Sequence, residues 1–311
     1  MTLTQLEYII AIDNYRHFAQ AAAHCHVTQP TLSAQVQKLE ETLGVKIFDR
    51  SKQPVLPTEQ GKLILQQARK IIAEKEVLLE HIAAQKGIIG GTLKLGIIPT
   101  LAPYLLPLFI PAFTQQYPDV TLIVHEYTTE TLLVKLKEGA IDAGLLVTPL
   151  NDVAIKEDVL FYEELVAYVS KNHQAYQKEY VLAKDIDANQ LWLLEEGHCF
   201  RSQIINLCEL KRQHQQGGHF EYEAGSLETL RRMVERTGGI TILPELATLD
   251  LSSRQQQHVK RFKQPAPVRE VSLITHRDFV KKRLIEALKQ QILQHIPAHL
   301  LTPKKKKIIS L

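Results

Sequence analysis

The chain contains little cysteine, tryptophan or methionine and only a small excess of one charge. Its 311 residues include three cysteines, one tryptophan and two methionines, and 37 basic against 34 acidic side chains leave a net charge of +3. Three cysteines are too few for the disulfide framework of a secreted domain, and an odd number cannot all pair with one another. The small charge excess does not by itself indicate binding to nucleic acid or membrane. Any nucleic-acid function must therefore be argued from sequence patterns.

Long apolar runs are also missing. The best stretch, Tyr104 to Phe113, is interrupted by Pro107 and Pro111 and falls short of the roughly 18 residues that suggest a membrane span. The first residues carry Glu7 and Asp13 and lack a basic leader, so they do not read as a signal peptide. We therefore expect a soluble protein of the reducing cytoplasm, with no membrane partner.

The composition that is present is that of a folded protein. Hydrophobic residues make up 45% and charged residues 23%, enough apolar material to bury a sizeable core, and the length indicates about two domains. The 13 histidines include no pair at a convincing metal-ligand spacing together with a third ligand. We expect no metal and no cofactor.

Residues 1–57 predict short helices followed by a wing. The helices are expected over residues 3–14, 18–24 and 28–43. The third carries an apolar stripe at helical spacing, formed by Leu32, Val36, Leu39 and Leu43. Thr28 occupies the N-cap position, so the helix should start near Gln29. Residues 50–58 look like a short β-hairpin.

This arrangement suits the major groove of DNA, because the groove admits one helix with polar residues at its start. The candidate contacts to bases and phosphates are Thr28, Gln29, Pro30, Thr31, Ser33, Gln37, Lys38, Arg50 and Lys52. Five basic and five acidic side chains in residues 1–57 cancel, so binding depends on local clustering and on dimerisation. The alternative is a helical bundle that contacts other proteins.

Residues 58–87 predict one long helix. Its apolar seam follows coiled-coil spacing and consists of Ile64, Ala68, Ile71, Lys75, Leu78 and Ile82. We expect this helix to dimerise, with an ordinary amphipathic helix packed on its own domain as the alternative. Gly87 and then Gly90–Gly91 end it and predict a hinge.

Residues 88–300 alternate between strand and helix patterns, which predicts a mainly parallel α/β sheet. The economical arrangement has two lobes, 88–164 plus 268–300 and 165–267, with a cleft between them. One hypothesis places a small metabolite in that cleft, in contact with Thr100 and Ser226. The basic tail, 301–311, carries Lys304 to Lys307 and is expected to be solvated and frayed.

The stretch around Cys199 is the most informative in this half. A predicted strand over 191–194 leads through Gly197 into a helix that starts near Phe200, which places Cys199 at its N-terminus. Partial positive charge at the helix start, with His198 and Arg201 adjacent, would favour the thiolate, the form that attacks a peroxide. Cys208 is a candidate for a second thiol. Two buried structural cysteines are the alternative.

Geometry sharpens the thiol hypothesis. Nine residues of continuous helix separate two α-carbons by about 13 Å, whereas a disulfide needs less than about 7 Å. A bond between Cys199 and Cys208 would therefore require the helix to break, which is the behaviour of a bistable element. A thiol peroxidase would use the same attack chemistry, but it leaves residues 1–57 unexplained.

Several motifs resemble the LysR-type transcriptional regulators. They are Ala19 to Ala23, Val27 to Ser33, Gln37 to Glu40, Leu43–Gly44, Phe48 to Arg50 and Leu56 to Gly61. The resemblance implies a winged helix-turn-helix, a linker-helix dimer and a two-lobed α/β regulatory domain like a periplasmic binding protein. It also implies a homodimer or homotetramer on double-stranded promoter DNA, acting with RNA polymerase, and no enzymatic activity.

A second set of motifs resembles the hydrogen-peroxide-sensing members of that family: Ile97 to Leu101, Pro103 to Pro107, Gly197 to Cys199, Ser226 to Arg231 and Gly239 to Thr241. The resemblance implies that Cys199 is the peroxidatic and Cys208 the resolving cysteine, with glutaredoxin or thioredoxin as the reductant. The residues it places around the peroxide and the thiolate are Thr100, Thr129, Gly197, His198, Arg201 and Arg269. The chain departs from the pattern over 209–218 and at Val268.

Overall fold

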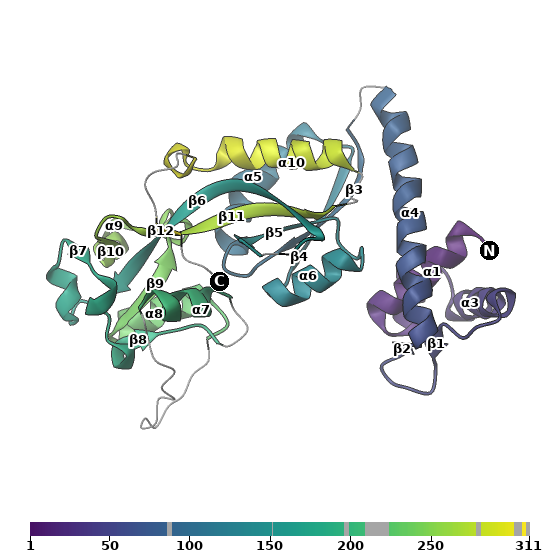
Figure 1. Ribbon diagram of the computed structural model, residues 1–311, viewed down its shortest axis with the longest axis horizontal. Coiled ribbons are helices and arrows are strands. Elements are labelled where there is room, and N and C mark those ends of the chain that lie inside the picture. Colours follow the sequence, from purple (N-terminus) through teal and green to yellow (C-terminus); the bar gives the residue numbers. More distant parts are fainter. Residues whose placement is uncertain are drawn as a thin grey trace.

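The computed structural model describes residues 1–85, 89–150, 152–195, 199–208, 224–277, 281–301 and 307–308. A small helical unit, one long helix and a larger α/β unit follow one another along the chain (Figure 1). The sequence also predicts a strand over 219–223. That segment lies outside the described residues, as do Gly197, His198, the stretch 209–218 that departs from the family pattern and Lys304 to Lys306 of the tail.

The N-terminal unit consists of three helices and a two-stranded wing. These are α1 (Leu3–Tyr15), α2 (Phe18–His24), α3 (Gln29–Leu43), β1 (Phe48–Asp49) and β2 (Leu56–Pro57). The predicted start of α3 is confirmed, because the Thr28 side chain accepts a hydrogen bond from the Thr31 backbone N–H. Leu32, Val36 and Leu39 are fully buried, whereas Leu43 at the end of the predicted stripe is 38% exposed.

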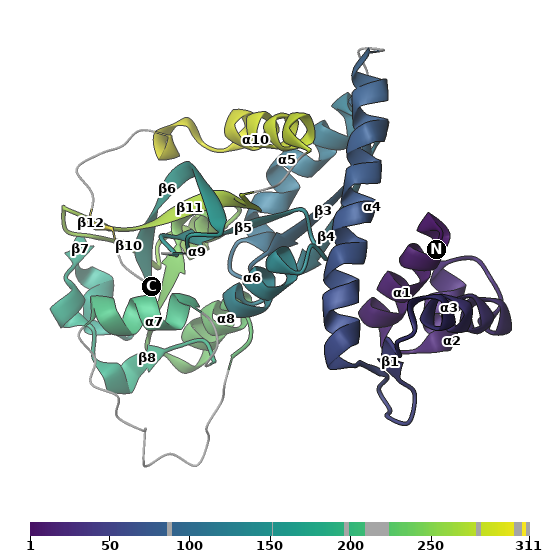
Figure 2. The same cartoon turned by 45° about the vertical axis from the view of Figure 1, so that its right-hand side comes forward.

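The long helix α4 (Glu59–Gln85) stands between the N-terminal unit and the α/β unit in both views (Figures 1 and 2). Some residues of the predicted seam pack against the N-terminal unit, and others are exposed. Ala68 is buried in the core of the N-terminal unit, and Lys75 forms an ion pair with Glu7 of α1. Ile71, Leu78 and Ile82 remain exposed. The first part of α4 thus packs on its own domain, and the second part leaves an apolar row uncovered.

The first lobe is a mixed sheet covered on both faces. Its strands are β3 (Gly91–Ile97), β4 (Val120–Glu126), β5 (Ala143–Thr148), β11 (Pro267–His276) and the first part of β6 (Ile155–Val169). β3 is parallel to β4 and β5, and β11 is antiparallel to β5 and β6. Helices α5 (Ala102–Gln116) and α10 (Lys282–His295) pack together on one face, and α6 (Thr129–Lys137) covers the other (Figure 1).

The second lobe is built on the end of β6, which pairs with β9 and β10. Its strands and helices are β7 (Tyr180–Val181), β8 (Leu191–Trp192), α7 (Cys199–Leu207), α8 (Leu227–Thr237), β9 (Ile240–Pro244), α9 (Ser253–Gln256) and β10 (Val259–Phe262). Short 3-10 helices are η1 (Gln174–Gln177), η2 (Ala183–Asp185), η3 (Ala188–Gln190), η4 (Glu245–Thr248) and, after α10, η5 (Ala298–Leu300). Each lobe has its own apolar core.

The strand β6 is longer than its pattern predicts and belongs to both lobes. The sequence predicts a strand over 165–170, whereas the structure extends it back to Ile155. Charged residues in this stretch hide the alternation. Two of them, Glu163 and Glu164, are accommodated by ion pairs with Arg269 and Arg261.

The prediction of a frayed tail is wrong for two residues. Lys307 and Ile308 form β12, which pairs in parallel with Pro267 and Val268 of β11.

The described ranges contain no helix that is both long enough and apolar enough to cross a bilayer. The same ranges hold no cluster of three or more histidine, cysteine or acidic side chains placed to bind a metal.

Candidate functional site

Cys199 is the first residue of α7, as the sequence predicts, and it lies where the two lobes meet. It packs against the apolar core of the first lobe, whereas the next residue, Phe200, is fully buried in the core of the second. Cys208 directly follows the last residue of α7 and packs against the second-lobe core. All three cysteines, including Cys25, are free. One helix therefore holds the two thiols apart.

Two threonines of the first lobe belong to the same site. Thr100 follows β3 and is 3% exposed, and Thr129 is the first residue of α6. Thr128, not Thr129, caps α6. The Thr129 hydroxyl acts to lower the pKa of the Cys199 thiol, against the larger effect of burial. It has no other hydrogen-bond partner among the described residues. It is a buried polar group left available beside the sulfur.

Arg269 of β11 supplies the positive charge of the site and has no exposed area. Its Nε donates to a Glu163 carboxylate oxygen at 2.7 Å. Its two Nη atoms donate to the hydroxyl and the carbonyl oxygen of Thr100, at 3.1 and 3.2 Å. The guanidinium carbon lies 5.3 Å from the centroid of the Phe200 ring, within the range of a cation–π contact. Arg269 is thus fixed by β6, the end of β3 and the first turn of α7.

The pKa of the Cys199 thiol is raised, which corrects the expectation of a lowered value. Burial is the largest influence and raises the pKa, because an anion loses its hydration there. The Thr129 hydroxyl, the Arg269 charge and the N–H groups at the start of α7 act in the opposite direction without overcoming it. Burial alone raises the pKa of the Cys208 thiol to about 11.

Arg201, which the sequence places beside Cys199, has a backbone partner in the structure. Its Nη1 donates to the backbone carbonyl of Leu194 at 2.7 Å, at the end of the strand region that leads into α7. The cation that lowers the thiol pKa is Arg269. Sequence reasoning also missed Glu163, because it lies just before the strand predicted over 165–170, in a stretch for which the pattern predicts no element. The one available signal was that a buried arginine needs a counter-ion.

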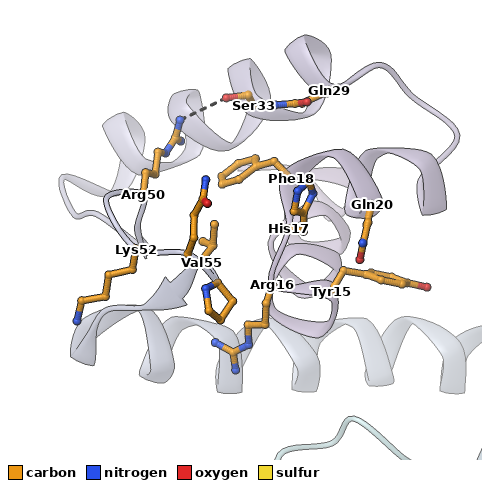
Figure 3. Close-up of a pocket in the computed structure, with 12 residues that line it drawn as sticks. Tyr15, Arg16, His17, Phe18, Gln20, Gln29, Ser33, Arg50, Lys52 and Val55 are labelled. Carbon is orange, nitrogen blue, oxygen red and sulfur yellow. Dashed lines mark hydrogen bonds between the residues drawn. The ribbon is translucent and has the colours of Figure 1, made fainter.

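A groove in the N-terminal unit gathers four of the predicted DNA-contact residues (Figure 3). It is lined by Tyr15, Arg16, His17, Phe18, Gln20, Gln29, Ser33, Arg50, Lys52, Gln53, Pro54 and Val55. Gln29 and Ser33 come from α3, and Arg50 and Lys52 from the wing. The turn between α1 and α2 adds Arg16 and His17, and the start of α2 adds Phe18; the sequence did not single out these three residues.

Arg50 ties the wing to α3. Its Nη1 donates to the Ser33 hydroxyl at 3.3 Å, the dashed bond of Figure 3, and its guanidinium carbon lies 5.1 Å from the Phe18 ring centroid. Its Nη2 pairs with the buried carboxylate of Glu40 at 3.2 Å. Glu40 also accepts the backbone N–H of Ile47 at 2.8 Å. Arg50 is therefore held in place before any DNA arrives.

The remaining predicted DNA-contact residues lie outside the lining of this groove. The Thr28 and Thr31 hydroxyls form a hydrogen bond of 2.8 Å at the start of α3. Gln37 donates to Glu41 at 3.0 Å on the exposed face of the helix. Pro30 and Lys38 are also exposed. Within the groove, Lys52 lies 3.8 Å from Asp49.

Comparison with known proteins places these features in a family. The model of the bacterial regulatory helix-turn-helix protein, lysR family, matches residues 3–62, and that of the LysR substrate binding domain matches 86–297. The chain is 36% identical over 300 residues to a hydrogen peroxide-inducible genes activator of Dickeya chrysanthemi, covering 96% of this chain and 97% of that protein.

Solved structures agree with the sequence matches. Full-length OxyR from Pseudomonas aeruginosa, in a cysteine-to-aspartate variant, matches with a TM-score of 0.78 and 35% identity, covering 95% of this chain and 99% of that one. A cysteine-to-serine variant of OxyR from Corynebacterium glutamicum, with hydrogen peroxide bound, matches with a TM-score of 0.63 and 27% identity over 98% of both chains. The chain therefore belongs to the LysR family of bacterial regulatory proteins.

Proposed function

We propose that the chain is a DNA-binding transcriptional regulator that senses hydrogen peroxide through Cys199. The observation that carries this proposal is the Cys199 thiol at the lobe junction, beside the otherwise unpartnered Thr129 hydroxyl and the buried Arg269. The OxyR structures and the peroxide-inducible activators among its relatives support it. We assign residues 1–57 to DNA binding, 58–87 to dimerisation, 88–300 to sensing and 301–311 to a basic tail.

The proposed chemistry has two balanced steps. The Cys199 thiolate attacks one peroxide oxygen, so an S–O bond forms, the O–O bond breaks and the departing hydroxide takes a proton to become water. The sulfur is then a sulfenic acid. The Cys208 thiolate attacks that sulfur, so an S–S bond forms, the S–O bond breaks and the departing hydroxide takes a proton to become a second water. Both thiols are oxidised together, and one peroxide is reduced to two waters.

The side chains around Cys199 have separate tasks in the first step. Thr129 and Thr100 offer hydroxyls to a bound peroxide, and Arg269 stabilises the thiolate by its charge. Gly197 and His198 complete the proposed site from outside the described residues. Arg201 donates to the backbone carbonyl of Leu194 and so links α7 to the strand region that precedes it.

The proposed output is a change in DNA contacts. Closing the disulfide unwinds α7, and the rearranged regulatory domain alters a homodimer or homotetramer on double-stranded operator DNA. The proposed DNA contacts are those of α3 and the wing: Thr28, Gln29, Pro30, Thr31, Ser33, Gln37, Lys38, Arg50 and Lys52. RNA polymerase is the proposed downstream partner, and glutaredoxin or thioredoxin the reductant in the cytoplasm. The protein acts as a switch and not as an enzyme.

The test adds a slight excess of hydrogen peroxide to the reduced full-length chain and maps disulfides by mass spectrometry. A Cys199–Cys208 link that is absent from the Cys199→Ser variant is the expected result. DNA footprints of the reduced and oxidised chain should then differ. If both thiols stay reduced while the denatured chain is readily oxidised, the sensing proposal is wrong.

A further inference from the structure

The partner of Arg269 is as fully buried as Arg269 itself. Glu163 of β6 lies directly opposite Arg269 of β11 in the strand register, and both side chains have no exposed area. One Glu163 carboxylate oxygen accepts from Arg269 Nε at 2.7 Å. The other accepts the backbone N–H of Leu246, in η4, also at 2.7 Å. Both carboxylate oxygens are therefore engaged, and the carboxylate has a single placement.

The two ends of the Arg269 guanidinium face different groups. The Nε side meets Glu163, and both Nη atoms donate to Thr100. The positive charge also acts on the Cys199 thiol. Because a buried charge interacts strongly with its neighbours in a low dielectric, the carboxylate on the Nε side reduces the field that the thiol experiences.

We propose that Glu163 is a positioning residue of the thiol site, which fixes Arg269 against Thr100 and restrains the effect of the Arg269 charge on the Cys199 sulfur. This inference rests on the proposed function only for its biological meaning, since it concerns the reactivity of the thiol toward any electrophile. In the sensor, Glu163 lowers the sensitivity. It keeps more of Cys199 in the protonated, slowly reacting form, so a given rate of oxidation requires a higher peroxide concentration.

The test measures Cys199 alkylation by iodoacetamide against pH, on the reduced full-length chain, with the Cys199 peptide quantified by mass spectrometry. Glu163→Gln removes the charge and keeps the size of the side chain. Its alkylation profile should shift to lower pH, with about tenfold faster alkylation at neutral pH, since removing a nearby like charge favours the anion. Arg269→Gln should shift the profile to higher pH.

The neighbouring residue provides a matched control. Glu164 is also a largely buried carboxylate on β6, but it pairs with Arg261 instead of Arg269. Glu164→Gln should leave the Cys199 profile unchanged. Glu163→Asp, which keeps the charge, should return the profile toward that of the parent. A purely structural role for Glu163 would change the melting temperature without moving the pH profile.

A double variant tests whether Glu163 acts through Arg269. A buried carboxyl without its cation protonates, so Glu163→Gln should add nothing once Arg269→Gln is present. Both partners are then neutral, which also makes this variant the more tolerant one if Glu163→Gln alone does not fold. Faster alkylation in the double variant than in Arg269→Gln overturns the proposal, as does an unchanged or upward-shifted profile for folded Glu163→Gln.

Failure of this inference is distinguishable from failure of the sensor assignment. If peroxide produces the Cys199–Cys208 disulfide but Glu163→Gln leaves alkylation unchanged, only the role of Glu163 is wrong. If Glu163→Gln shifts the alkylation profile but peroxide oxidises neither thiol, the role of Glu163 stands and the proposed function is wrong.

Discussion

Cys199 is the first residue of the continuous helix α7, and Cys208 directly follows its last residue. The rise of an α-helix places their α-carbons about 13 Å apart, about twice the limit for a disulfide. The reduced arrangement is stabilised by Phe200 and Ile204, which are fully buried in the second lobe. Under the proposed function, oxidation has to overcome the packing of this helix, so the proposed switch is a competition between the disulfide bond and the folded helix.

The first prediction is that α7 loses its helical hydrogen bonds on oxidation. Amide hydrogen exchange over 199–207 should accelerate at least tenfold in the peroxide-treated chain, because the disulfide cannot span an intact helix. The Cys208→Ser variant, treated identically, should keep its protection. A mapped Cys199–Cys208 disulfide with unchanged protection over these residues would contradict the prediction.

The second prediction concerns the pH dependence of Cys208. Burial raises the pKa of its thiol to about 11, so the nucleophilic thiolate forms only as the pH rises toward that value. Alkylation of Cys208 in the folded, reduced chain should climb about tenfold per pH unit through pH 9.5 without levelling off, whereas the unfolded thiol should level off above about 8.5. The denatured chain is the control, and a plateau near its value in the folded chain would refute the prediction.

The raised pKa of the Cys208 thiol also predicts how the stability of the fold depends on pH. Folding favours the protonated thiol, so the contribution of this group is fully present below the unfolded pKa of about 8.5 and is lost as the pH rises through about 11. Cys208→Ala should remove this part of the alkaline loss of stability, as measured by urea unfolding at several pH values.

The third prediction is that Thr129→Val slows the reaction of Cys199. The Thr129 hydroxyl partly offsets the effect of burial on the pKa of the Cys199 thiol. It has no other hydrogen-bond partner within the described ranges. Its loss should reduce the rate of oxidation by peroxide about tenfold, measured by stopped-flow trapping of the reduced thiol. Thr114→Val is the control, since the Thr114 hydroxyl donates only to backbone carbonyls within α5. Equal rates for the two variants would show that Thr129 plays no part.

Much of this architecture could be predicted from local patterns. The N-cap Thr28 and the start of α7 depend on residues close in sequence, and so does the strand that the pattern predicts over 120–126, which are the observed bounds of β4. Capping and helical periodicity are local properties, so the sequence carries them directly.

What the sequence could not provide is the outcome of burial. The helix start and the neighbouring cations predicted a lowered thiol pKa, yet the pKa of Cys199 is raised because two lobes close over it. In the same way, nothing local marks Glu163 as a site residue, because its partner Arg269 is brought opposite it only by the pairing of β6 with β11. Both effects depend on contacts between residues far apart in the chain.

The fourth prediction is that Arg50→Gln weakens DNA binding. Arg50 is held between Ser33, Glu40 and Phe18, so its charge is positioned for a phosphate in advance. Its removal should weaken operator binding about tenfold and reduce the slope of log affinity against log salt by about one. Lys156→Gln, which removes an exposed cation of the first lobe, is the control. Equal salt slopes for the two variants would remove Arg50 from the interface.

The fifth prediction is that the second part of α4 forms the dimer contact. Ile71, Leu78 and Ile82 are 40%, 61% and 47% exposed and recur at coiled-coil spacing, an arrangement that a second copy of the helix would bury. Leu78→Glu places a charge in that contact and should raise the dimer dissociation constant at least tenfold in sedimentation equilibrium. Gln66→Glu adds the same carboxylate to an exposed position outside the apolar row and should leave the constant unchanged. Because Leu78 contributes nothing to the buried core of its own chain, a dimer unaffected by Leu78→Glu would mean that the subunits associate elsewhere.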